Sequence, residues 1–188
     1  MKVIKFRSFF SQLILATISL LIVSAPAQAE SAKKMESAAR KALSALYKST
    51  PGAKALGEKA VAVLIFPSIT KGGFIIGGQY GEGTLFKDDK VGGFYSTAAA
   101  SYGLQAGLQK FGYAMFFMKE SDLSYLDKSD GWEIGVGPSI TIVDKGLASS
   151  LSSTTAREGV FAFFFEQKGL MAGLGLQGTK ISKIKQKP

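Results

Sequence analysis

Six glycines lie within the thirteen residues from Lys71 to Gly83, set among large apolar side chains. Glycine costs chain entropy on folding, so this concentration indicates a place where the bare backbone is needed. Three uses fit such a run. It can cradle a phosphate, let strands pack closely, or open a slot for an apolar ligand. The residue types beside the glycines test the phosphate use directly.

Two glycine patterns are similar to nucleotide-binding motifs, and neither is complete. Gly72 and Gly77 have the spacing that opens a P-loop. Gly78 and Gln79 follow, where a P-loop needs lysine and then serine or threonine. The segment 173–178 fits G-x-G-x-x-G but ends ten residues before the C-terminus. Because a dinucleotide site needs a helix and a second strand after that motif, we expect no nucleotide cofactor.

Catalytic side chains are scarce, because the chain contains neither histidine nor cysteine. This removes the usual general base, the common nucleophile–base pairs and the commonest metal ligand. Asp130 and Glu133 are close enough to suggest an acid–base pair, but charged residues at the start of a strand are usually solvated. The run 127–131 hints at a calcium loop, yet its glycine comes one position early and no glutamate closes it. We expect no enzymatic activity, no metal and no cofactor.

The start of the chain has the pattern of a secretory signal peptide. Positive residues precede an apolar run from Phe9 to Val23, and small residues at 27 and 29 form a cleavage site. The apolar run is shorter than the roughly 20 residues that a transmembrane helix needs. We expect cleavage after Ala29, a single domain over residues 30–188, and a periplasmic or secreted location. No cysteine is present for lipid attachment.

Positive charge dominates the chain, with a formal net charge of +9. The basic residues concentrate in the first segment after residue 30 and in the last nine residues. Such a surface favours anionic lipid head groups, acidic polysaccharide or nucleic acid as partners. Export makes nucleic acid the least expected of these, so we predict no nucleic-acid partner.

The elements that must position these residues begin with a helix. Apolar residues, mostly alanine, recur at helical spacing from Ser31 to Lys48, with basic residues beside them. The run Ser49-Thr50-Pro51-Gly52 ends the pattern. Two interpretations remain open. The helix packs on the core of the domain, or it lies on a membrane surface with its lysines toward head groups.

After Ala60 the pattern changes to short apolar strands. The expected strands cover residues 60–66, 74–80, 84–87, 91–96, 101–108, 113–118, 132–143, 160–167 and 170–178. Pro67 is expected to stop the first strand, and Asp88-Asp89-Lys90 to form a hairpin turn. Ser121–Lys128 predicts a short helix with Ser121 as its N-cap, whereas residues 147–155 fit a loop or a helix.

This series predicts one α+β domain, in which a glycine-rich antiparallel sheet or barrel is covered by N-terminal helices. Glycines recur four residues apart, at 73 and 77, 103 and 107, 131 and 135, and 169 and 173. Positions four apart share a face of a strand, so each pair leaves a bare strip. Neighbouring strands fill these strips, or the strips receive an acyl chain.

Several ordered motifs resemble those of the SYLF domain family. They are Ile65-Phe66-Pro67, Lys71-Gly72-Gly73-Phe74, the run 77–83, the run 130–138 and the run 165–173. The resemblance extends from about Ala32 to Ile184, and it implies a lipid-binding module. Eukaryotic members bind phosphoinositide membranes, and some fungal members bind actin. In that branch an N-terminal amphipathic helix and basic residues are held to contact the membrane.

For an exported protein the resemblance implies an anionic or general phospholipid, or a free acyl chain, rather than a phosphoinositide or actin. The candidate lipid-binding residues are Lys33, Lys34, Arg40, Lys41, Lys71, Lys168 and Trp132. As the one tryptophan of the chain, Trp132 is expected to be a core anchor or a ligand platform. The alternative function is a structural or protein-interaction role in the cell envelope, without a lipid ligand.

Overall fold

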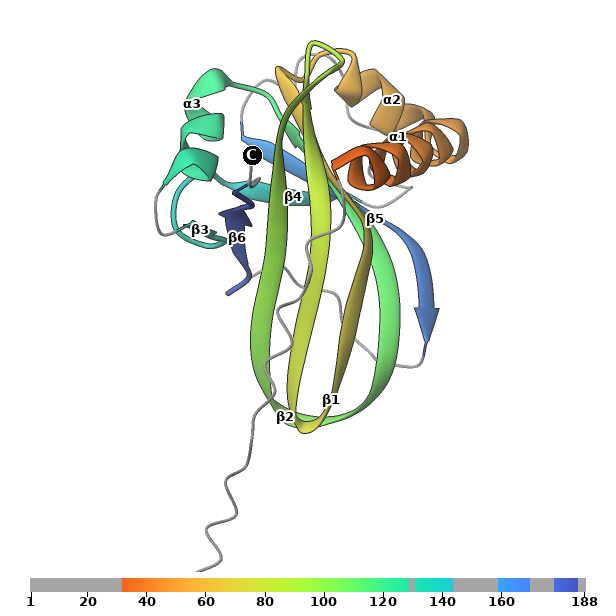
Figure 1. The fold of residues 1–188 in the computed structure, drawn as a ribbon, viewed down its shortest axis with the longest axis vertical. Coiled ribbons are helices and arrows are strands. Elements are labelled where there is room, and N and C mark those ends of the chain that lie inside the picture. Colours follow the sequence, from red (N-terminus) through yellow and green to blue (C-terminus); the bar gives the residue numbers. More distant parts are fainter. Residues whose placement is uncertain (1–31, 129–130, 144–158, 170–177, 186–188) are drawn as a thin grey trace, which may run out of the picture.

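A computed structural model gives the fold of the chain (Figure 1). It describes residues 32–128, 131–143, 159–169 and 178–185, so the predicted signal peptide lies outside the described residues. The elements are α1 (Ala32–Ser49), α2 (Pro51–Gly57), β1 (Ala62–Lys87), β2 (Lys90–Phe117), α3 (Glu120–Leu123), a 3₁₀ helix (Ser124–Asp127), β3 (Trp132–Glu133), β4 (Ile140–Val143), β5 (Val160–Gly169) and β6 (Lys180–Lys183). The predicted α+β fold with a barrel-like sheet and N-terminal helices is confirmed.

Helix α1 packs on the core through its apolar side. Met35, Ala39, Ala42 and Leu46 follow one another at spacings of three and four residues, and all four are buried. This spacing places them on one stripe of the helix. Ala39, Ala42 and Leu46 of this stripe form one cluster with apolar residues of β1, β2 and β5. Of the two interpretations of this helix, packing on the core is therefore the one observed.

Strands β1 and β2 form a long antiparallel ribbon that is folded back on itself. The turn Asp88–Asp89 joins them, and both residues have positive φ, at 48° and 61°, as a two-residue type I′ turn requires. The predicted hairpin turn is confirmed. The register of the ribbon shifts between Phe74 and Ile76, where Figure 1 shows the strands curving back at the lower end of the molecule.

The glycine run lets the two halves of β1 lie against each other. A Cβ atom on Gly81 would lie 2.6 Å from the side chain of Ile69, and one on Gly83 would meet the carbonyl oxygen of Ile65. Next to the bend, a Cβ atom on Gly73 would meet the backbone of its own strand four residues later. Real Cβ atoms do not approach so closely. Close packing of the chain is thus the observed use of these glycines.

Several predicted strand ends are wrong. Pro67 does not stop the first strand, because the ladder with β2 shifts its register between Phe66 and Ile69 and then continues. A bulge accepts proline, which has no N–H group to donate to the ladder. The predicted strands 74–80 and 84–87 lie within β1, which the strand 60–66 overlaps from Ala62 on. The predicted strands 91–96 and 101–108 lie within β2, which the strand 113–118 overlaps up to Phe117.

The remaining strands extend the ribbon on its β2 side. β5 pairs with the second half of β2, and β6 pairs with the first half. β3 pairs with β6. All three of these strand pairs are antiparallel. β4 pairs with β5 in parallel, so the predicted antiparallel sheet includes one parallel pair and is mixed.

Two further expectations need correction. The predicted strand 132–143 is divided into β3 and β4 by a turn in which Gly135 and Gly137 have positive φ. Helix α3 begins at Glu120, and Lys119 rather than Ser121 occupies its N-cap position without a side-chain hydrogen bond. Residues 147–155 and 170–177 lie outside the described residues.

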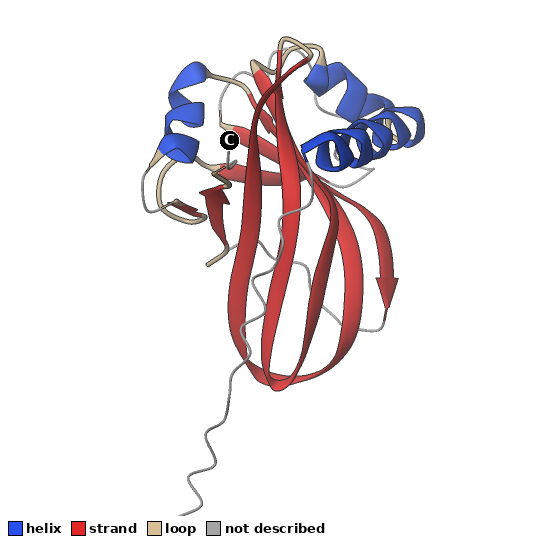
Figure 2. Cartoon of the chain, viewed as in Figure 1, coloured by secondary structure: helices blue, strands red, loops and turns tan. Residues whose placement is uncertain are grey.

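Figure 2 shows the helices around one end of the long strands, while the bend of the ribbon forms the other end. Two apolar clusters hold these parts together. One lies under α1 and α2, with Ile65, Phe116 and Phe161 among its members. The other lies on the opposite face of the same strands and includes Phe66, Tyr113 and Trp132. The helix end is therefore the packed end, and the bend projects away from it.

Candidate functional site

The outward side of α1 is strongly cationic. Its exposed basic residues are Lys33, Lys34, Arg40, Lys41 and Lys48. Glu36 is the one acidic residue of the helix. We call these five basic residues the cationic face of α1. The structure thus brings four of the seven predicted site residues together on one element.

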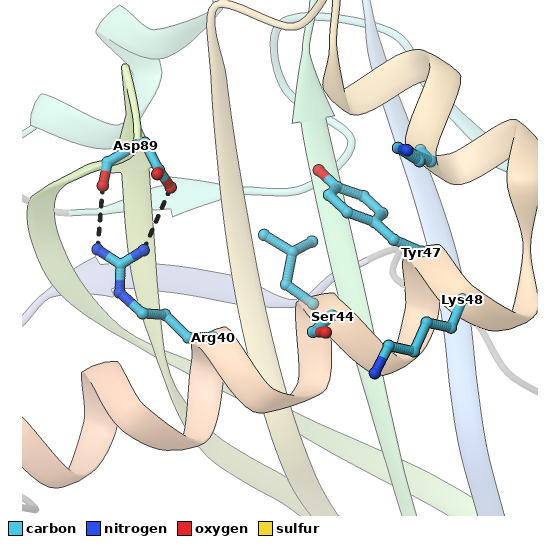
Figure 3. A pocket seen from close by; sticks show the side chains of 7 residues that line it. Arg40, Ser44, Tyr47, Lys48 and Asp89 are labelled. Atoms are coloured by element: carbon cyan, nitrogen blue, oxygen red, sulfur yellow. Dashed lines mark hydrogen bonds and ion pairs between the residues drawn. The ribbon is translucent and has the colours of Figure 1, made fainter.

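Arg40 ties α1 to the turn between β1 and β2 (Figure 3). Its Nη1 donates to Asp89 Oδ1 at 3.2 Å, and its Nη2 donates to the Asp89 carbonyl oxygen at 3.0 Å. Its Nε donates to Glu36 Oε1 at 2.8 Å, and this hydrogen bond is the main cause that raises the pKa of Arg40. The guanidinium also lies 4.6 Å from the centre of the Phe86 ring. Arg40 therefore has a structural role besides its charge.

A groove of about 430 Å³ runs along α1 beside this arginine. Its lining residues are Arg40, Leu43, Ser44, Tyr47, Lys48, Lys54 and Asp89. Burial raises the pKa of Tyr47 to about 12, so its phenol is neutral at neutral pH. Lys54 Nζ lies 3.9 Å from Glu58, on a surface where such a pair is weak. The groove offers an apolar floor with basic groups at its rim.

The other two predicted lysines lie toward the bent end of the ribbon. Lys71 on β1 is opposite Gln109 on β2, and Lys168 on β5 is opposite Lys110 on β2. The three lysines thus occupy three adjacent strands. Lys110 and Lys168 are exposed, and Lys71 is half-buried. Because Arg40 contacts the turn at the other end of β1, the predicted residues form two separate surfaces rather than one.

Sequence reasoning missed Lys110 and the apolar residues next to these lysines. Phe74, Ile76 and Leu108 are exposed by 75%, 68% and 60%. We call these three side chains the apolar tip. A regular hairpin about the Asp88–Asp89 turn would pair residue i of β1 with residue 177 − i of β2. Only the pairs next to the turn, such as Lys87 with Lys90, follow this rule. Later register shifts move the partners, so the sequence carried no clear sign of this grouping.

Trp132 belongs to the core. Its side chain is 1% exposed, and its Nε1 donates to the Val136 carbonyl oxygen at 3.0 Å. The rings of Phe117 and Tyr125 lie about 6 Å from its own, at 6.1 and 6.2 Å between centres. Such an enclosed ring cannot reach a ligand at the surface. Of its two expected roles the structure shows the core anchor, and Trp132 joins neither surface.

Comparison with protein-family models and with curated proteins gave no match for this chain, so membership of the SYLF family stays a prediction from the motifs. Over the described residues, every helix falls short of the length and apolar character needed to cross a bilayer. The same part of the chain contains no group of three or more acidic side chains placed to hold a metal ion. The two cationic surfaces are accordingly the features on which a functional proposal rests.

Proposed function

We propose that this protein binds the surface of anionic phospholipid membranes and does so without catalysing a reaction. The observation that carries the proposal is the cationic face of α1, which carries five basic residues and one acidic residue. Each lysine or arginine near an anionic bilayer contributes about 1 kcal/mol of attraction. Clustered basic charge therefore favours an extended anionic surface over a single small anion.

Binding at the surface is favoured over shelter of an acyl chain inside the sheet. The space beside Gly81 and Gly83 is occupied by Ile69, Ile65 and Phe66. The apolar side of α1 is likewise covered by the core, as Met35 is 2% and Ala39 is 0% exposed. In this conformation the helix offers its charges to a membrane and keeps its apolar stripe inside.

Co-sedimentation with vesicles tests the proposal. The purified protein should pellet with phosphatidylglycerol-containing vesicles and stay in the supernatant with phosphatidylcholine vesicles, most clearly at low ionic strength. Replacing three exposed lysines of α1 (Lys33→Gln, Lys41→Gln and Lys48→Gln) should weaken pelleting at low salt, because the attraction is electrostatic.

A matched variant removes the same charge elsewhere. Lys59→Gln, Lys90→Gln and Lys185→Gln change three exposed lysines outside α1 and its groove. This control should lose less binding than the α1 variant. Equal and negligible pelleting of the wild-type protein with both vesicle types would refute the proposal and favour a protein-interaction role in the envelope.

A further inference from the structure

The apolar tip is a compact exposed patch at one end of the molecule. Leu108 lies opposite Gly72 in the ribbon, and a Cβ atom on Gly72 would lie 3.2 Å from Leu108 Cδ1. Phe74 is two residues after Gly72 and so shares that face of β1. Ile76 is two residues after Phe74, on the far side of the register shift. Single exposed apolar residues are common on proteins, whereas neighbouring ones indicate an interaction surface.

Positive charge lies directly behind the tip. Lys110 is two residues from Leu108 on the same strand, which places it on the same face and about 7 Å farther from the bend. Lys168 sits opposite Lys110 on the neighbouring strand. Lys71 on β1 lies at the same level, but its side chain shares the other face of the ribbon with Gln109.

The Lys110–Lys168 pair costs the protein stability. Like charges directly opposite each other on neighbouring strands repel. Within the described residues, neither lysine forms an ion pair with a carboxylate that would offset this repulsion. A pair of this kind is stabilised when an anionic surface approaches it. The bent end therefore combines an exposed apolar patch with the like-charged pair Lys110 and Lys168.

We propose that the bent end of the ribbon is the part of the protein that enters an anionic phospholipid bilayer. Phe74, Ile76 and Leu108 insert at the boundary between head groups and acyl chains, and Lys110 and Lys168 behind them contact lipid phosphates. Interfacial elements bury their apolar side about 5–10 Å deep, which matches the spacing between tip and lysines. This inference rests on the proposed function, since it assigns the contact surface for the same partner.

The arrangement gives α1 a different part in binding. Figure 1 places α1 beside the upper part of the long strands, away from the bend. With the tip in the bilayer, the cationic face of α1 lies farther from the membrane than the tip and does not touch it, so its charges contribute mainly to the initial attraction at low ionic strength. A second copy of the chain is a poorer occupant of the tip, because two tips in contact would bring Lys110 and Lys168 of both copies together.

Single-site labelling tests which surface meets the membrane. The chain has no cysteine, so Ile76→Cys and Ser44→Cys each give one site for an environment-sensitive nitrobenzoxadiazole label. Ser44 is exposed on α1. With phosphatidylglycerol vesicles containing doxyl-labelled lipid, the label at 76 should shift its emission to the blue and be quenched, and the label at 44 should change little.

The opposite pattern would overturn the inference and leave the proposed function standing. If the label at 44 is quenched and the label at 76 is not, α1 is the docking surface. If the unlabelled wild-type protein does not bind these vesicles at all, the proposed function fails, and the inference fails with it.

A pair of double variants tests the same point without a label. Phe74→Ser with Leu108→Ser should lower partitioning into the vesicles on the order of a hundredfold, because two inserted side chains are lost. Val136→Ser with Ile142→Ser is the control, since these side chains are 62% and 47% exposed outside the tip. Both variants should keep the wild-type melting temperature, because exposed substitutions change stability little.

Two results would contradict tip insertion. One is a tip variant that partitions like the control variant. The other is a wild-type protein that forms dimers in sedimentation equilibrium, while the tip variant is monomeric and still binds vesicles. That second result would assign the tip to a contact between copies of the chain.

Discussion

Single glycines decide whether the long ribbon of this protein can fold back on itself. Gly83 lies so close to Ile65 that a methyl group has no place between them. Gly78 lies in the same run, yet its nearest neighbour for an added Cβ atom is the Ala99 carbonyl oxygen, at an ordinary 3.6 Å. The glycines of one sequence motif thus differ in what they do.

We predict that Gly83→Ala lowers the free energy of unfolding by about 2 kcal/mol, because the added methyl group overpacks the contact between the two halves of β1. Gly78→Ala is the matched control and should change that free energy by less than about 0.5 kcal/mol. Urea denaturation of the two variants measures both values. Equal losses in the two variants would contradict the packing role of Gly83.

Three tyrosines whose pKa is raised in the folded protein control its response to alkaline pH. Burial raises the pKa of Tyr113, whose hydroxyl donates to Thr97 Oγ1 at 2.9 Å. Burial also raises the pKa of Tyr47 to about 12, and burial together with the hydrogen bond to Glu82 raises that of Tyr80 to about 12. All three phenols are therefore more easily ionised in the unfolded chain, where the pKa is about 10.

The sign of the pH effect follows from these shifts. Folding favours the neutral phenols, so their stabilisation is complete below about pH 10 and is lost as pH rises toward 12 and beyond. We predict a constant unfolding free energy from neutral pH to about pH 10 and a steep fall above it. Tyr113→Phe should make the fall less steep. Ionisation of every tyrosine near pH 10 in the folded protein, measured at 295 nm, would contradict this.

At the scale of the elements, Arg40 connects α1 to the turn between β1 and β2. We predict that Arg40→Ala lowers the free energy of unfolding by about 1 kcal/mol, because it removes a forked contact to Asp89 and the contact with the Phe86 ring. Lys41→Ala should cost less than about 0.5 kcal/mol, because Lys41 is an exposed neighbour. Urea denaturation at low and high salt measures both.

High salt should reduce the difference in unfolding free energy between Arg40→Ala and Lys41→Ala, since the Arg40 contacts are charged and partly exposed. If Arg40→Ala unfolds at the same urea concentration as Lys41→Ala, the contacts of Arg40 do not stabilise the fold. Arg40 would then act only as one of the charges of the cationic face of α1.

The sequence predicts the elements that depend on local signals, but not the features that depend on pairing between distant strands. Helical spacing from Met35 to Leu46 and the turn at Asp88–Asp89 are local signals, and both predictions are confirmed. The continuation of β1 through Pro67 depends on a bulge that the partner strand imposes, so residue types alone indicated a stop. The grouping of Lys110 with Lys168 depends on pairing between strands far apart in the sequence.

The same distinction applies to the predicted site. The basic residues of α1 were found together because they belong to one helix. Trp132 was included as a possible ligand platform, but long-range packing encloses it. The sequence does not predict the apolar tip, because phenylalanine and leucine in a strand are usually buried. Phe74 and Leu108 are exposed because they lie next to the bend.

For the whole molecule, the two ends differ in composition and in proposed role. The helix end holds the packed clusters and the cationic face of α1, and the bent end holds the apolar tip and three lysines. A protein docked by the bent end would have its helix end pointing away from the bilayer into solution. Such an orientation joins long-range attraction by α1 with short-range insertion of the tip.

The most direct measurement is the partition coefficient of the wild-type protein between buffer and vesicles, as phosphatidylglycerol progressively replaces phosphatidylcholine. We predict that the coefficient rises steeply with the anionic fraction and falls with added salt, because the basic residues near the surface are screened. A coefficient that stays negligible, or that is independent of the anionic fraction, would contradict binding to anionic phospholipid membranes.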